Sequence, residues 1–127
     1  MNLPDPRLFH LATRNAWQQA VAHGTYAPES LQTEGFIHCS TVAQIVETAN
    51  RWYRGRSDLL LLQIDARRLT ADLRHEPPVH PGDERRAQCF PHIYGPLNLD
   101  AVDRMMEFPC DREGTFTLPQ ALRTGGQ

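Results

Sequence analysis

The hydrophobic pattern of the chain begins with a short strand-like run at residues 8–12 and then changes to helical spacing. Over 13–23, apolar side chains recur three and four positions apart, as on one face of an amphipathic helix. Thr13 is a suitable N-cap for this helix, and Gly24 is a natural stop. The pattern therefore predicts a strand, a helix and then a loop at 24–34 with room for one helical turn.

A second strand and a second helix follow in the same order. Residues 35–39 predict the strand, and apolar side chains over 42–53 form the clearest helical stripe in the chain. Ser40 or Thr41 can cap this helix, and Thr41 with the glutamine three residues later fits a capping box. Gly55 is expected to end the helix.

The second half of the chain predicts mainly strands. Residues 59–64 form an apolar run whose short length favours a strand buried on both faces. Pro91 and Pro96 confine any strand near them to a sheet edge or a short piece. Residues 76–88 carry three prolines, one glycine and five charges, so we expect an exposed loop that is the most mobile internal segment. Further strands are predicted at 71–75, 90–97 and 101–108.

Two helices early in the chain and strands late in the chain are typical of the α+β class. The 127 residues correspond to one domain. We expect the core of this domain at 8–108 and a C-terminal extension at 109–127. The last residues, 124–127, are expected to be frayed.

Charge and composition exclude several classes of function. A formal net charge of −2 lacks the basic excess that drives non-specific binding to nucleic acids. All thirteen basic residues are arginine, and without lysine neither Schiff-base catalysis nor a P-loop is possible. The longest apolar run, 59–62, is too short to span a bilayer, and the N-terminus has no signal-peptide pattern. We therefore expect a cytoplasmic protein with no membrane contact and leave the oligomeric state open.

Three of the six histidines lie in strand-like apolar settings, namely His10, His38 and His92. An imidazole in a strand needs hydrogen-bond partners when it is buried, so each histidine taken alone could equally be a satisfied core residue. Three of them in so small a domain favour a shared site, and we expect His10 and His38 to face one pocket. His38 precedes the predicted helix cap at Ser40 and Thr41, where free N–H groups could bind a phosphate or pyrophosphate. The alternative is that the two hydroxyls only cap the helix.

Other side chains carry weaker signals. Tyr53 and Tyr94 could stack on a ligand ring or donate a hydrogen bond to it, although half-buried tyrosines at a core margin are common. Arg85 and Arg86 lie in the proline-rich loop and are expected to be solvated. The three cysteines have no C-x-x-C spacing, which argues against a disulfide framework and a structural zinc site. A zinc ion held by the three strand histidines stays an alternative, although their spacing is not that of hydrolytic zinc sites.

The blocks F-I-H-C-S and F-P-H-I-Y-G-P-L, with F-H-L-A-T near the start, closely resemble the bacterial domain-of-unknown-function family DUF952. The resemblance covers residues 8–108. It implies a remote relationship to the ADP-ribosyltransferase fold, in particular to its tRNA 2′-phosphotransferase branch. That fold is a split β-sheet core that holds NAD in a cleft. The implied fold class is thus an α+β protein with an ADP-ribosyltransferase-like core and two main helices in the N-terminal half.

The same resemblance implies roles for individual residues. His10 would contact the nicotinamide ribose or the amide, and His38 would bind a ribose hydroxyl or a phosphate oxygen. The third position of that branch is a hydrophobic residue near the last strands, and His92, Ile93 and Tyr94 are the nearby candidates for it. The candidate catalytic residues are therefore His10, His38 and His92. The candidate cofactor-binding residues are Thr13, Ser40, Thr41, Tyr53 and Tyr94.

The leading hypothesis is a protein that binds NAD or another ADP-ribosyl nucleotide in a cleft between His10 and His38 and transfers the ADP-ribosyl group. The chain has no E-x-E motif and no basic patch, which argues against a protein acceptor and against tRNA. The expected partner is therefore a small-molecule nucleotide. The alternatives are a non-catalytic nucleotide-binding module and a histidine-rich, metal-dependent hydrolase.

Overall fold

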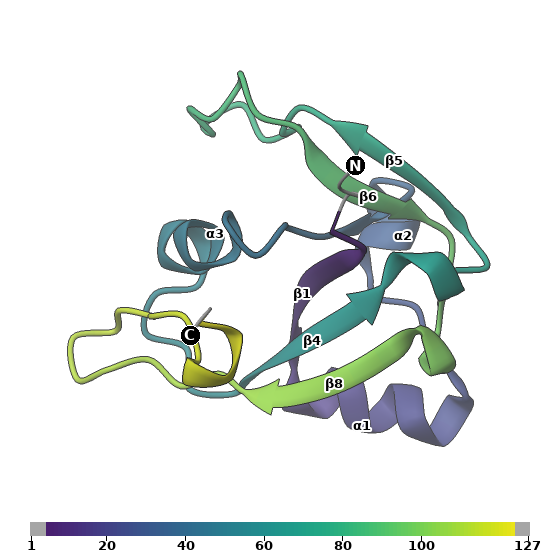
Figure 1. The fold of residues 1–127 in the computed structure, drawn as a ribbon, viewed down its shortest axis with the longest axis horizontal. Coiled ribbons are helices and arrows are strands. Elements are labelled where there is room, and N and C mark those ends of the chain that lie inside the picture. The colour runs from purple at the N-terminus through teal and green to yellow at the C-terminus, as the bar shows by residue number, and fades with distance from the viewer. Residues whose placement is uncertain (1–4, 124–127) are drawn as a thin grey trace.

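The computed structural model describes residues 5–123, and its longest strands form one antiparallel sheet (Figure 1). In this sheet β4 (Leu59–Asp65) lies between β1 (Arg7–Thr13) and β8 (Val102–Glu107). Six of the seven β4 residues are buried. The predicted apolar strand at 59–64 is therefore confirmed, and it is central because both of its edges are paired.

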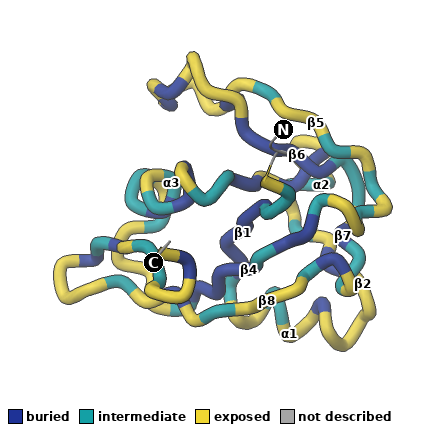
Figure 2. The backbone as a smooth tube through the Cα atoms, in the orientation of Figure 1, coloured by how far each residue is buried: buried dark blue, intermediate teal, exposed yellow. Residues whose placement is uncertain are grey.

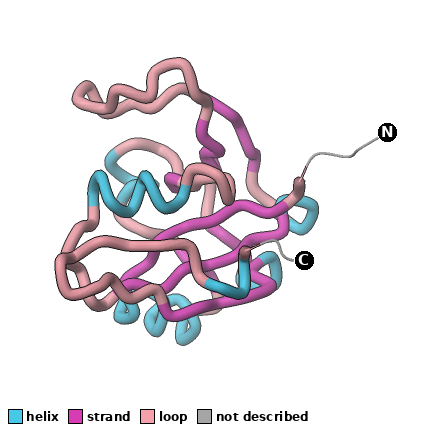
Figure 3. The backbone as a smooth tube through the Cα atoms, turned by 60° about the vertical axis from the view of Figure 1, so that its left-hand side comes forward, coloured by secondary structure: helices cyan, strands magenta, loops and turns pink. Residues whose placement is uncertain are grey.

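A second antiparallel sheet stands above the first in Figure 1. Its order is β3 (Ile37–His38), β6 (Phe90–Tyr94) and β5 (Asp72–Glu76), so β6 is the central strand. The long loop between β5 and β6 extends beyond this sheet, as Figure 3 shows. A third pairing joins β2 (Thr25–Tyr26), a strand that the sequence pattern did not indicate, to β7 (Leu97–Asn98).

The prolines were predicted to confine any strand in the 90–97 region to a sheet edge or a short piece; the sheet edge is wrong for β6, whereas the region does form two short strands, β6 and β7. Pro91 lies within the central strand β6. It is tolerated there because it contributes its carbonyl oxygen, which accepts a hydrogen bond from the backbone N–H of Cys39 at 3.0 Å. The pairing with β3 ends at His38 opposite His92, one residue beyond the proline. A missing N–H at position 91 therefore removes no donor from that pairing.

The two three-stranded sheets are joined at one place. The backbone groups of Phe9 in β1 and Ser40 exchange two hydrogen bonds, each 2.8 Å long. This junction places the end of β3 against the edge of β1. His10 and His38 are thereby brought close together, although 28 residues separate them in the sequence.

Helix α1 (Arg14–His23) forms as its sequence predicts. The side-chain oxygen of Thr13 accepts a hydrogen bond from the backbone N–H of Ala16 at 3.0 Å. Gly24 ends the helix with a φ of 92°, a left-handed conformation that a glycine adopts at little cost. The predicted N-cap and stop are both confirmed.

Helix α3 (Ile45–Trp52) begins later than predicted, and neither Ser40 nor Thr41 is its N-cap. Ser40 is paired with β1, so its backbone stays extended. Half of the predicted capping box is present, because the side-chain oxygen of Gln44 accepts from the backbone N–H of Thr41 at 3.0 Å. The short helix α2 (Ser30–Thr33) occupies the loop in which one helical turn was expected.

The packed core continues beyond the expected boundary at residue 108. Phe116 and Leu122 are 1% and 5% exposed and pack with the buried side chains of β1 and α3, and Figure 2 shows buried positions in this last segment. The residues 124–127, which we expected to fray, lie outside the described part of the chain. Short 3-10 turns are found at Ala66–Arg68, Leu99–Ala101 and Gln120–Leu122. Within residues 5–123, no helix has the length and apolar character needed to cross a membrane.

Candidate functional site

A cavity of about 350 Å³ lies where the two sheets meet α3 and the loop between β5 and β6. Its size is at the lower end of the range for small-molecule sites. His10, His38 and His92 all line it, from β1, β3 and β6 respectively. The prediction that His10 and His38 face one pocket is therefore confirmed, and His92 joins them.

The ring of His10 is held by the chain on both sides. Its Nδ1 lies 2.6 Å from the backbone oxygen of His38, and its Nε2 lies 2.7 Å from the hydroxyl of Tyr26. A carbonyl oxygen can only accept, so Nδ1 donates and Nε2 accepts from the tyrosine. Burial lowers the pKa of His10 to about 4, so the ring is neutral at pH 7. A ligand could bind either nitrogen only by breaking one of these bonds.

The protonation of His10 predicts a loss of stability in acid. The unfolded chain binds this proton with an ordinary pKa near 6.5, more tightly than the folded protein does. The stabilisation is full above pH 6.5 and is lost as the pH falls toward 4, by about 3 kcal/mol in total. Urea denaturation across this pH range should show that loss in the wild type and a smaller one in His10→Gln. Equal pH dependence in both proteins would contradict it.

His38 lies at the mouth of the cavity with its side chain half exposed. Its Nε2 is hydrogen-bonded to a carboxylate oxygen of Glu34, which lies just after α2. A carboxylate accepts, so Nε2 carries the proton. Nδ1 is then the nitrogen left for a ligand or a solvent molecule.

His92 is only 2% exposed and is fixed by a carboxylate from the neighbouring strand. Its Nδ1 lies 2.7 Å from Oε1 of Glu76, and the hydroxyl of Tyr94 donates to the same oxygen at 2.7 Å. The ring of Phe36 stacks on His92 with a centroid distance of 4.0 Å. Burial lowers the pKa of His92, although the hydrogen bond to Glu76 opposes that shift.

The two histidines of this sheet lie next to each other. The ring centroids of His38 and His92 are 5.7 Å apart, and Phe36 contacts both rings. Each imidazole has a carboxylate partner that fixes which nitrogen carries the proton. Two oriented imidazoles at one cavity wall can donate and accept protons, which is the chemistry of general acid–base catalysis.

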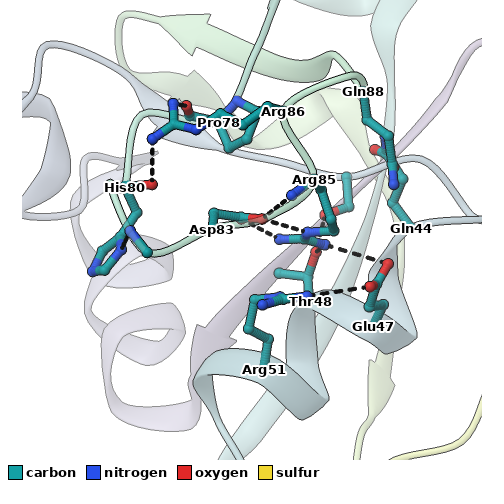
Figure 4. A network of polar contacts seen from close by, with 12 residues as sticks. Gln44, Glu47, Thr48, Arg51, Pro78, His80, Asp83, Arg85, Arg86 and Gln88 are labelled. Carbon is teal, nitrogen blue, oxygen red and sulfur yellow. Dashed lines mark hydrogen bonds and ion pairs between the residues drawn. The ribbon is translucent and has the colours of Figure 1, made fainter.

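A buried ion pair in the loop between β5 and β6 also lines the cavity (Figure 4). The guanidinium of Arg85 forms two hydrogen bonds with the carboxylate of Asp83, of 2.9 and 2.7 Å. It also donates to the hydroxyl of Thr48 on α3 at 2.8 Å and lies over the ring of Phe90. The Arg85 guanidinium lowers the pKa of Asp83 to about 2.

This network corrects the expectation that Arg85 is solvated, whereas most residues of the loop at 76–88 are exposed, as predicted. Asp83 is 4% exposed and Arg85 is 8% exposed, because the pair folds back onto α3. Arg86 is bound as well, since it donates to the backbone oxygens of Pro78 and His80. Spacing alone could not show that this loop has polar groups to bury.

Apolar and aromatic side chains form the entrance of the cavity. Trp52 is 42% exposed, and its ring centroid lies 4.4 Å from that of His80. Val79 beside them is 49% exposed. An exposed aromatic face at a cavity entrance is suited to stacking on a planar ring.

The structure separates the five predicted cofactor-binding residues into two groups. Ser40 and Tyr53 line the cavity, whereas Thr13, Thr41 and Tyr94 are not among its lining residues. Thr13 caps α1, and Tyr94 is bound to Glu76. The backbone N–H of Thr41 is taken by Gln44. The expected pyrophosphate site at this turn therefore lacks the free helix N-terminus on which it depended.

Sequence reasoning missed several residues of this site. Glu34, Glu76 and Asp83 supply its carboxylates, and Trp52 forms its entrance. One signal was present for Glu76. His92 and Tyr94 are two positions apart on a strand and so share a face, where both are bonded to Glu76. The others depend on contacts between segments far apart in the chain.

The side chains of the described residues offer no ready metal site. Across residues 5–123, no group of three or more histidine, cysteine, aspartate and glutamate side chains is placed to hold a metal ion. The zinc-dependent alternative therefore has no ligand set here. Cys39 lines the cavity, but burial raises the pKa of its thiol, so it stays protonated and unreactive.

Comparison with known proteins assigns the chain to a family. Residues 11–105 match the family model described as protein of unknown function, DUF952, and the chain belongs to this family. The crystal structure of CC0527 from Caulobacter crescentus is 33% identical, with a TM-score of 0.76 over 88% of this chain and 94% of that chain. The solution NMR structure of CC0527 is also 33% identical, with a TM-score of 0.70 over 92% and 94%. No curated protein matches the chain.

Proposed function

We propose that this protein binds NAD or another ADP-ribosyl nucleotide in the cavity and breaks the bond between nicotinamide and ribose. The observation that carries the proposal is the convergence of His10, His38 and His92 on one cavity at the junction of two sheets. A split core of two small antiparallel sheets is what an ADP-ribosyltransferase-like relative would have. The two small antiparallel sheets of this chain support the proposal by analogy.

The cavity residues suit such a ligand. The space of about 350 Å³ would take the nicotinamide ribose half of the molecule, and the other half would extend past the entrance. Trp52 there would stack on a planar heterocycle. The free Nδ1 of His38 would bond to a ribose hydroxyl, while His10 would shape the cavity floor.

Binding should raise the thermal stability of the protein by mass action. At a ligand concentration about one hundred times the dissociation constant, the gain should be about 2.7 kcal/mol. His38→Ala should lose most of this gain, because it removes the ligand contact at the mouth. The measurement is a thermal melt with millimolar NAD or ADP-ribose, together with quenching of Trp52 fluorescence.

His75→Ala is the matched control, because His75 is exposed on β5 and does not line the cavity. It should keep the full stabilisation by NAD. The proposal fails if neither nucleotide shifts the melting temperature of the wild type. It also fails if both histidine variants respond to NAD as the wild type does.

One observation favours a second candidate, a binding module without catalysis. Both nitrogens of His10 are used within the chain, so one of the three histidines is committed to structure. Release of free nicotinamide from NAD, followed by chromatography, separates the candidates. Binding without release would leave the non-catalytic module.

A further inference from the structure

The hydrogen bonds of Glu76 determine which nitrogen of His92 faces a ligand. Oε1 of Glu76 accepts two hydrogen bonds, one from the Tyr94 hydroxyl and one from Nδ1 of His92, each 2.7 Å long. Nε2 is therefore the unprotonated nitrogen of the ring. It has no hydrogen-bond partner among residues 5–123, and the ring lines the cavity.

The ring also cannot easily turn away from this position. Phe36 stacks on it at 4.0 Å with an interplanar angle of 20°. The β5–β6 pairing places Arg74 opposite His92, and Glu76 two residues further along on the same strand. An oriented, unprotonated nitrogen in a cavity wall is the arrangement that a general base needs.

The charges around the cavity indicate the kind of molecule that would give up the proton. Glu34, Glu76 and Asp83 place three carboxylates at or near the wall. Arg85 is the single arginine among the described residues that line the cavity, and Asp83 already neutralises it with two hydrogen bonds. An anionic acceptor would thus be repelled by these carboxylates, and no free arginine would offset the repulsion. A neutral hydroxyl would not be repelled.

We propose that His92 accepts the proton of a neutral hydroxyl acceptor, water or an alcohol, and that Glu76 is its positioning residue. This inference rests on the proposed function and names the acceptor class of that reaction. It separates the protein from a transferase whose acceptor is a phosphate group, since an anionic acceptor needs no base to remove a proton.

The step balances without any redox partner. The bond between ribose C1′ and the nicotinamide ring nitrogen breaks, and its electron pair neutralises the positive charge of that nitrogen. The acceptor oxygen forms a new bond to C1′. Its proton passes to Nε2 of His92 and then to solvent, which returns the imidazole to its neutral form.

His92→Asn should lower the rate of nicotinamide release by about one hundredfold or more, the usual contribution of a general base. It should keep the stabilisation by NAD, since His38 and Trp52 remain. The inference would be overturned if His92→Asn released nicotinamide at the wild-type rate. It would also be overturned if the wild type bound NAD and released no nicotinamide. Both outcomes would leave the proposed binding intact. Absence of NAD binding by the wild type would overturn both.

A pH profile with Glu76→Gln distinguishes positioning from a structural role and does not depend on how His92→Asn folds. The charged and titratable groups around His92 are Glu76 and Arg74 from β5, His38 from β3 and, beyond it, Glu34. The Glu76 carboxylate raises the pKa of His92, so its loss should move the acid limb of the release profile to lower pH. An unmoved acid limb would overturn the role of Glu76, and His75→Ala should leave the profile unchanged.

The acceptor class is tested by competition. With methanol in the reaction, we expect methyl ADP-ribose in addition to ADP-ribose. With inorganic phosphate at the same concentration, we expect ADP-ribose alone. Preferential formation of ADP-ribose 1-phosphate would overturn the inference.

Discussion

Replacing Asp83 by asparagine is expected to lower the free energy of unfolding by about 3–5 kcal/mol. Asparagine has nearly the same shape as aspartate, so packing changes little; the charge is lost, together with the hydrogen bond to the oxygen that the amide NH2 group replaces. The Arg85 guanidinium, whose side chain is 6% exposed, would then keep only the longer ion pair with the exposed carboxylate of Glu47, at 3.9 Å. Urea denaturation at pH 7 measures the effect.

The matched control is Asp5→Asn, because Asp5 forms an exposed pair with Arg7 over the same sequence spacing of two residues. Exposed pairs contribute about 1 kcal/mol or less, so this variant should remain close to the wild type. A loss of the same size in both variants would show that the burial of the Asp83 pair does not matter.

The same pair predicts a second acid-sensitive contribution. Because Arg85 depresses the pKa of Asp83 to about 2, the pair stabilises the fold fully above the ordinary aspartate pKa near 3.8. That contribution is lost as the pH falls from there toward 2. This loss should be absent in Asp83→Asn. It occurs at lower pH than the loss of stability caused by protonation of His10.

Leu61→Ala is expected to lower the free energy of unfolding by about 2–5 kcal/mol. Leu61 is 0% exposed at the middle of β4, the strand paired on both edges. Truncation removes buried apolar surface and leaves a cavity that a central strand cannot collapse to fill. Urea denaturation with an unchanged m-value would identify the loss as one of native-state packing.

Met105→Ala on β8 is the control, since Met105 belongs to the same sheet and is 46% exposed. Its loss should be within about 0.5 kcal/mol, as for most surface substitutions. Comparable losses at both positions would mean that β4 is not the packed centre of the fold.

Elements whose signals are local were predictable from the sequence. Helix α1 has a cap at Thr13 and a stop at Gly24, both within a turn of its ends, and β4 begins with four consecutive leucines and is apolar at five of its seven positions. These features act through neighbouring backbone atoms, so their effect does not depend on tertiary contacts and can be predicted from the sequence. The order of β1, α1, β3 and α3 and the α+β class follow from such signals.

Elements that depend on distant partners were not predictable. Ser40 could have capped a helix, but its backbone pairs with Phe9 and the helix begins only at Ile45. Pro91 is compatible with the central strand β6 because β3 ends at His38, before the pairing would require a backbone N–H at position 91. The local residue pattern predicts neither the start of α3 nor the central position of Pro91.

The candidate site shows the same division. The sequence by itself identified three histidines in strands, because polar rings in apolar runs demand partners wherever they are buried. Only the tertiary structure decided which partners they have. It placed His10 between a carbonyl and Tyr26, and it gave His38 and His92 their carboxylates. It also buried Arg85 and Asp83 from a loop whose composition predicts exposure. The physical reason is that side-chain chemistry is local, whereas desolvation and pairing depend on segments that meet only when the chain has folded.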